Sequence, residues 1–271
     1  MQELEVNSFE EYRNIVIDYS FHDWIYRGQN DYIYDLNSSL FRTIERNEKI
    51  RSNNKQRVIH LVREKYEEEL IKAFKNTCHI YISDLPSKRS TFDWLALMQH
   101  YGAPTRLLDF SFSPYIALYF AISGAKDDAA VYCINYKDIT KIDKRSITNL
   151  DMYYYQNIMK QEKDIHNTIL VPFEPTFTNE RLFAQQGVFL VPNSLNFSHH
   201  EILEENYDNT YYTKIKIKSS CFVDIITELQ KMNITASSIY PGFEGFCKSF
   251  EYIGILPITQ VRHLPNLIDE Y

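Results

Sequence analysis

The 271-residue chain is poor in glycine and cysteine. Seven glycines and nine prolines are too few for a low-complexity or disordered protein, whereas 44% hydrophobic and 15% aromatic residues can fill a sizeable core. The four cysteines lie far apart, and no spacing between them indicates a zinc site or a redox pair. The composition therefore predicts a folded protein with reduced thiols and no bound metal.

Membranes and nucleic acids are not expected partners. No segment approaches the roughly 20 apolar residues of a membrane span, and the first residues, MQELEVNSFEEYRN, are acidic and polar where a signal peptide is basic and then apolar. The formal net charge of −7 gives little attraction to a phosphate backbone. We therefore expect a cytoplasmic protein whose candidate partners are a small nucleotide-like ligand or another protein.

The hydrophobic pattern predicts an α+β fold, with a mixed, mainly antiparallel sheet and helices packed on it. Lys214 and Lys216 alternate with isoleucines, which indicates a strand with one solvated face, and Gly28 and Gly187 are interpreted as turn residues with positive φ. A polar stretch at 141–167 is predicted to be an excursion from the core. Helices are expected over 9–19, 53–77, 91–101, 114–123, 222–232 and 242–252, and strands over 24–26, 129–136, 168–173, 188–192 and 212–219.

Polar side chains gather between two apolar helices in the segment 94–121, WLALMQHYGAPTRLLDFSFSPYIALYFA. One hypothesis is an internal network, in which Asp109 pairs with Arg106 or Arg27 and Ser113 caps the second helix. The other hypothesis is an anion site, because a helix N-terminus at Ser113 offers free N–H donors beside one or two guanidinium groups. Phosphate would suit such a site.

No glycine-rich phosphate loop, nucleophile elbow or HExxH motif is present, but five segments resemble a known family. This family is the bacterial and phage FRG domain, named after its Phe-Arg-Gly signature, in which Tyr26 here replaces the phenylalanine. The resemblance implies one FRG-type domain over 1–271, with a core at about 23–250, in a protein of mobile elements or phage defence. The segments are YRGQ at 26–29, NSSLFR at 37–42, residues 95–121, ERLFAQQGVFL at 180–190 and IYPGFEGFCKSF at 239–250.

A second resemblance, in chain order, is to ADP-ribosyltransferases of the arginine-serine-glutamate type. It implies that Arg27, before a glycine, would hold the phosphates of NAD, and that Ser111 would orient the ribose. The third element departs from the pattern, because Gln185 and Gln186 stand where a glutamate is expected. An amide does not accept a proton near neutral pH, so the departure bears on catalysis more than on binding.

These observations predict a polar pocket that binds a nucleotide-like anion, with NAD as the candidate substrate of glycosidic cleavage or ADP-ribosyl transfer. The alternative is a non-catalytic sensing or protein-interaction module whose arginine-aspartate network only braces the fold. The candidate catalytic residues are His100, Asp109 and Gln185, and the candidate ligand-binding residues are Arg27, Gln29, Gln99, Thr105, Arg106, Ser111 and Gln186.

Overall fold

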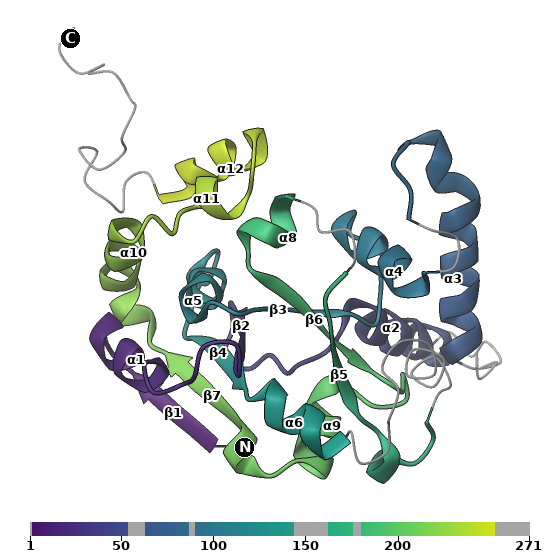
Figure 1. Cartoon of the computed structure of the whole chain (residues 1–271), viewed down its shortest axis with the longest axis horizontal. Coiled ribbons are helices and arrows are strands. Elements are labelled where there is room, and N and C mark those ends of the chain that lie inside the picture. Colours follow the sequence, from purple (N-terminus) through teal and green to yellow (C-terminus); the bar gives the residue numbers. More distant parts are fainter. Residues whose placement is uncertain (1, 54–62, 87–89, 144–161, 176–179, 253–271) are drawn as a thin grey trace, which may run out of the picture.

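The computed structural model describes residues 2–53, 63–86, 90–143, 162–175 and 180–252. Their strands form one seven-stranded sheet in the order β1-β7-β4-β2-β3-β6-β5 (Figure 1). The pair β1–β7 is parallel and the other neighbours are antiparallel, which confirms the predicted α+β fold. The strands are β1 (Gln2–Val6), β2 (Ile25–Gln29), β3 (Leu108–Ser111), β4 (Ala129–Ile134), β5 (Leu170–Phe173), β6 (Gly187–Pro192) and β7 (Tyr212–Ile217).

Helices cover both faces of this sheet (Figure 1). Alternate residues of β4 face opposite ways, as in any strand, so that Val131 packs with α1, α5, α10 and α11 while Tyr132 packs with α6 and α9. A third cluster joins α3 and α4 to β5 and β6. The helices are α1 (Phe9–Val16), α2 (Ser39–Asn53), α3 (Arg63–Thr77), α4 (Thr91–His100), α5 (Pro114–Ile122), α6 (Tyr136–Asp143), α8 (Glu180–Ala184), α9 (His199–Asn206), α10 (Phe222–Lys231), α11 (Ala236–Ile239) and α12 (Phe243–Lys248).

Capping residues are found at several helix ends, and the predicted cap at Ser113 is confirmed. The side chains of Ser8, Ser90 and Ser113 each accept a hydrogen bond from a backbone N–H in the first turn of α1, α4 and α5. Gly102 and Gly124, just after α4 and α5, have φ angles of 78° and 68°. Both conformations are in the left-handed region that favours glycine, and they end these two helices.

The predicted turn at Gly28 is wrong, because β2 continues through Arg27 and Gly28 to Gln29. Neither Gly28 nor Gly187 has a positive φ. At Gly28 a methyl group would overlap the carbonyl oxygen of Ala117 in α5, so glycine is needed for the close approach of helix and strand. At Gly187 a methyl group would overlap the side chain of Leu182.

The bounds of two predicted helices and of the polar excursion also differ between the sequence-based prediction and the structure. The helix expected over 53–77 is confirmed for α3, whereas α2 ends at Asn53 and residues 54–62 lie outside the described part of the chain. The helix expected over 242–252 is α12 followed by a 3-10 turn, Ser249–Tyr252. Of the polar excursion at 141–167, α6 reaches Asp143 and residues 144–161 lie outside the described ranges.

The face of β7 that carries the lysines is less solvated than predicted. Lys214 is 5% exposed, and its ammonium group lies 4.3 Å from the ring centre of Tyr32 and 5.2 Å from that of Tyr132. Cation–π contact with the two rings compensates in part for the lost hydration of the charge. Among the described residues, no helix is both long enough and apolar enough to cross a membrane.

Candidate functional site

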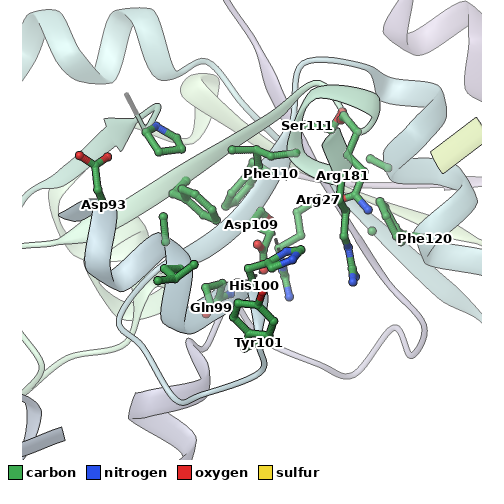
Figure 2. A pocket seen from close by; sticks show the side chains of 18 of the residues that line it. Arg27, Asp93, Gln99, His100, Tyr101, Asp109, Phe110, Ser111, Phe120 and Arg181 are labelled. Atoms are coloured by element: carbon green, nitrogen blue, oxygen red, sulfur yellow. Dashed lines mark hydrogen bonds and ion pairs between the residues drawn. The ribbon is translucent and has the colours of Figure 1, made fainter. Parts of the chain in front are cut away.

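A cavity of about 610 Å³ lies between β2, β3, α4, α5 and α8, and its volume is in the range of small-molecule sites (Figure 2). Its wall combines a few polar groups with aromatic and aliphatic side chains. The lining residues are Tyr26, Arg27, Gly28, Gln29, Asn30, Asp84, Leu85, Pro86, Asp93, Ala96, Leu97, Gln99, His100, Tyr101, Asp109, Phe110, Ser111, Ala117, Phe120, Pro175, Arg181, Leu182, Gln185 and Phe189.

The cavity is located where two central strands separate. The ladder between β2 and β3 has one pair, Tyr26 with Ser111, and Arg27 is the next residue of β2. Instead of a further ladder bond, Arg27 Nη1 donates a hydrogen bond of 2.7 Å to the carbonyl oxygen of Asp109. The guanidinium group therefore fills the opening between the strands and becomes part of the cavity wall.

The guanidinium group of Arg27 is poorly satisfied. Its side chain is 19% exposed, and its Nη1 lies 3.8 Å from Asp109 Oδ2, which is too far for a hydrogen bond. The Nε atom is buried and has no hydrogen-bond partner. Burial lowers the pKa of Arg27, Asp109 raises it, and Arg42 lowers it further. A buried cation with free donors that faces a cavity is suited to bind an anion.

Asp109 presents a fixed carboxylate to the cavity. Its side chain is 53% exposed, and Oδ2 accepts a hydrogen bond of 2.7 Å from Gln99 Nε2. Gln99 Oε1 in turn accepts a hydrogen bond of 2.6 Å from the hydroxyl of Thr105. Thr105 is fully buried and does not line the cavity, so it positions Gln99 and cannot contact a ligand as we had predicted.

Ser111 and Gln185 connect β3 to the end of α8. Ser111 Oγ donates to the backbone carbonyl of Gln185 over 2.7 Å and accepts from the backbone N–H of Ser113 over 3.0 Å. The side chain of Gln185 lines the cavity and donates to the carbonyl of Ile239. Gln186 does not line the cavity, and its predicted role as a ligand residue has no support in this geometry.

His100 and Gln29 complete the predicted set. His100 ends α4 on the cavity wall, and its pKa is lowered from 6.5, first by partial burial and then by Arg181, while Glu244 raises it. Its ring is therefore neutral near pH 7. Gln29 also lines the cavity, at the end of β2, and its amide lies 3.4 Å from the carbonyl of Asp35.

Arg106 does not line this cavity, and its predicted role as a ligand residue has no support in this geometry. The side chain is fully buried and forms an ion pair with Glu67 of α3, with Nε 2.8 Å and 3.0 Å from the two carboxylate oxygens. At the start of α5 the structure favours the cap hypothesis for Ser113 over the anion-site hypothesis. Ser113 is occupied as a cap, and α5 contributes Ala117 and Phe120 to the cavity, from the body of the helix.

Arg181 of α8 also lines the cavity, but it is not among the site residues predicted from the sequence. Its guanidinium carbon lies 4.8 Å from the ring centre of Tyr240, and Nη1 lies 3.8 Å from Glu244. Arg181 and Gln185 are four residues apart in ERLFAQQ, which places them on one face of a helix. This spacing is the sequence signal that could have identified Arg181 as a neighbour of the predicted site residue Gln185.

The described residues contain no group of three or more His, Cys, Asp or Glu that could hold a metal ion. Residues 22–130 match the model of the FRG domain, which confirms the resemblance to this family for that segment. The segment contributes Arg27, Gln99, His100 and Asp109 to the cavity, whereas Arg181 lies beyond the matched segment. The wider span of about 23–250 stays a prediction. No curated protein and no solved structure matches the chain.

Proposed function

We propose that the cavity binds a phosphate-bearing, nucleotide-like small molecule, with NAD as the first candidate. The observation that carries this proposal is the guanidinium of Arg27, which lines the cavity with one hydrogen bond to a backbone carbonyl and its nearest carboxylate 3.8 Å away. Phosphate oxygens accept paired hydrogen bonds from the planar fork of an arginine, and they compensate for the cost of its desolvation.

The aromatic part of the wall supports the same ligand class. Tyr101 and Phe120 line the cavity together with the aliphatic side chain of Leu97. Planar bases are held by contact with aromatic and apolar surfaces, while their phosphates need charged donors. One cavity with both kinds of surface suits a nucleotide better than it suits an inorganic anion.

The proposed reaction on NAD is cleavage of the bond between ribose C1′ and the nicotinamide nitrogen. A water molecule or an acceptor group forms the new bond to C1′, the bond electrons leave with nicotinamide, and the proton of the nucleophile passes to a base. Asp109 and His100 are the candidate bases among the titratable groups that line the cavity, which also include Asp84 and Asp93, and Gln185 cannot take this role. Ser111 Oγ keeps one lone pair for a ribose hydroxyl.

Calorimetry and product analysis test this proposal in two stages. Purified protein is titrated with NAD, ADP-ribose and ADP, and nicotinamide release from NAD is then followed by chromatography. We expect binding to the wild type and a loss of at least about tenfold in affinity in Arg27→Ala. No binding heat with any of the three compounds would overturn the proposal, and binding without release would reject the reaction while keeping the ligand class.

A second candidate function, a non-catalytic interaction module, is favoured by exposed aromatic side chains. Phe183 of α8 and Phe243 of α12 are 79% and 78% exposed. Such residues are enriched where proteins contact partners. The expected role in phage defence rests on the family resemblance, and the plating efficiency of phages on a host that expresses wild type or Arg27→Ala would test it.

A further inference from the structure

We propose that Arg181 is a second anion-binding residue of the cavity, so that the site prefers a ligand with two linked phosphate groups to a ligand with one. This inference rests on the proposed function. It goes further because it names the ligand class by its number of phosphates, and it assigns a residue from outside the matched FRG segment.

The donors of Arg181 are largely free. Its one ion pair, with Glu244, is 3.8 Å long, and the guanidinium makes no hydrogen bond to any residue in the described part of the chain. The side chain is 39% exposed and lines the cavity. Arginine has five N–H donors, so most of them remain available to a ligand.

The orientation of Arg181 is fixed before a ligand arrives. Its guanidinium lies over the ring of Tyr240, and that ring packs edge-on against Phe120 at a centroid distance of 6.0 Å. Gln185, one turn after Arg181, is held by its hydrogen bond to Ile239 of α11. Because the stacking already restricts the side chain, an anion that binds here costs little additional rotamer entropy.

Two guanidinium groups from different elements thus line one cavity. Arg27 comes from β2 and Arg181 from α8, and Figure 2 shows both directed to the part of the cavity where His100 lies. A ligand that places negative charge near each of them would give both guanidinium groups a partner. A single phosphate on Arg27 leaves Arg181 without a partner, whereas a diphosphate supplies oxygens for both.

Lys248 offers a matched control for this inference. Its ammonium group lies 4.6 Å from the ring centre of the same Tyr240 and 3.8 Å from the same Glu244. It does not line the cavity. Lys248→Gln therefore removes one positive charge and the same neighbouring contacts as Arg181→Gln, but it leaves the ligand donors in place.

The experiment compares AMP and ADP by calorimetry in wild type, Arg181→Gln, Arg181→Lys and Lys248→Gln, with melting temperatures as a check of folding. We expect the wild type to bind ADP at least about tenfold more tightly than AMP. Arg181→Gln should remove most of this preference through its loss of ADP affinity, and Lys248→Gln should keep it. Arg181→Lys, which retains the charge without the planar fork, should fold normally and keep part of the preference.

Different outcomes reject different claims. Equal wild-type affinity for AMP and ADP would overturn the role of Arg181 while the binding of nucleotides stands. An equal loss of affinity for AMP and ADP in Arg181→Gln would also overturn the role of Arg181. The same holds if Lys248→Gln loses the preference for ADP to the same extent, because either result would indicate a general effect of charge. If the wild type binds neither nucleotide, nor ADP-ribose nor NAD, the proposed function fails and this inference fails with it.

Discussion

Tyr26 and Ser111 form the single ladder pair between β2 and β3 in the described part of the chain, and Arg27 follows immediately after it. The position of this pair determines which groups can line the cavity. Beyond the pair the strands separate, the guanidinium of Arg27 bridges to the Asp109 carbonyl, and Gly28 lets α5 approach the strand. The opening in the sheet is thus lined by a charge on one side and by an apolar helix on the other.

Arg27→Ala should change ligand binding far more than stability. The substitution removes one hydrogen bond to a backbone carbonyl and a poorly satisfied charge, so we expect the free energy of unfolding to change by about 1 kcal/mol. Affinity for ADP should fall at least about tenfold, because a charge-assisted contact is lost. Urea denaturation and calorimetry on the same preparation measure the two quantities.

Arg42→Ala is the control for Arg27→Ala. Arg42 contributes to the electrostatic environment of Arg27 but does not line the cavity. The variant Arg42→Ala should therefore leave the affinity for ADP within a fewfold of the wild-type value.

The stability of Arg27→Ala tests the alternative hypothesis. A destabilisation of several kcal/mol in this variant would favour the hypothesis that Arg27 braces the scaffold, as expected of a buried paired charge.

Glu67→Leu should be strongly destabilising. It leaves the fully buried guanidinium of Arg106 without its carboxylate, and such a loss costs about 3–5 kcal/mol. The double variant Arg106→Leu/Glu67→Leu should recover a large part of that loss, since no unpaired charge remains. Denaturant unfolding of the two single variants and of the double variant gives the coupling energy.

A partly exposed ion pair of the same helix, α3, serves for comparison. Arg63, also on α3, pairs with Glu45 of α2, whose side chain is 51% exposed. Glu45→Leu should cost less than about 1 kcal/mol, because exposed pairs contribute little. A similar cost for Glu45→Leu and Glu67→Leu would contradict the structural role assigned to Arg106.

The local parts of the fold could be predicted from the sequence. A serine cap such as Ser113 depends on neighbouring residues alone, and it is confirmed. Gly28 shows where local reasoning fails. A turn and a close helix contact both require glycine, and only the packing of α5 on β2 distinguishes them.

The site could be predicted only in part for the same reason. Gln99, His100 and Asp109 lie in one segment, so the sequence already placed them together. Arg106 lies in that segment too, but its partner Glu67 is 39 residues away, and no local pattern shows that α3 brings a carboxylate to it. Arg181 enters the cavity because α8 precedes β6, which pairs with β3, a relationship that only the sheet order defines.

Gly28→Ala should destabilise the protein and impair the cavity together. The new methyl group would overlap backbone atoms of α5, which cannot move without disturbing the core, and we expect a loss of up to about 3 kcal/mol. Gly28 also lines the cavity, so ADP affinity should fall. Gly102→Ala is the control, because its φ of 78° is strained for alanine but nothing lies near the added methyl. It should cost about 1–2 kcal/mol and leave ADP affinity unchanged, as thermal unfolding and calorimetry would show.

The last prediction concerns His199, which is buried under β6 with its Nε2 3.0 Å from the carbonyl of Leu190. The pKa of His199 is lowered from 6.5 to about 4, first by burial and to a lesser extent by the charges of Arg27 and Arg106, while the hydrogen bond to Leu190 opposes this decrease. Between these two values the unfolded chain binds a proton that the folded chain does not. Stability therefore falls as the pH is lowered from 6.5 towards 4, by about 2 kcal/mol between pH 7.5 and pH 5.

His199→Gln isolates this contribution, because the amide can still donate to Leu190 and does not titrate in this range. The comparison is needed because Asp143 acts in the opposite direction. Its pKa is raised to about 7 by burial, so it contributes stability that is present below pH 4 and lost as the pH rises towards 7. Urea unfolding of both proteins at pH 7.5 and pH 5 should show a smaller decrease in His199→Gln than in the wild type. Equal decreases in the two proteins would mean that the folded state accommodates a protonated His199, and would remove it as a cause of acid sensitivity.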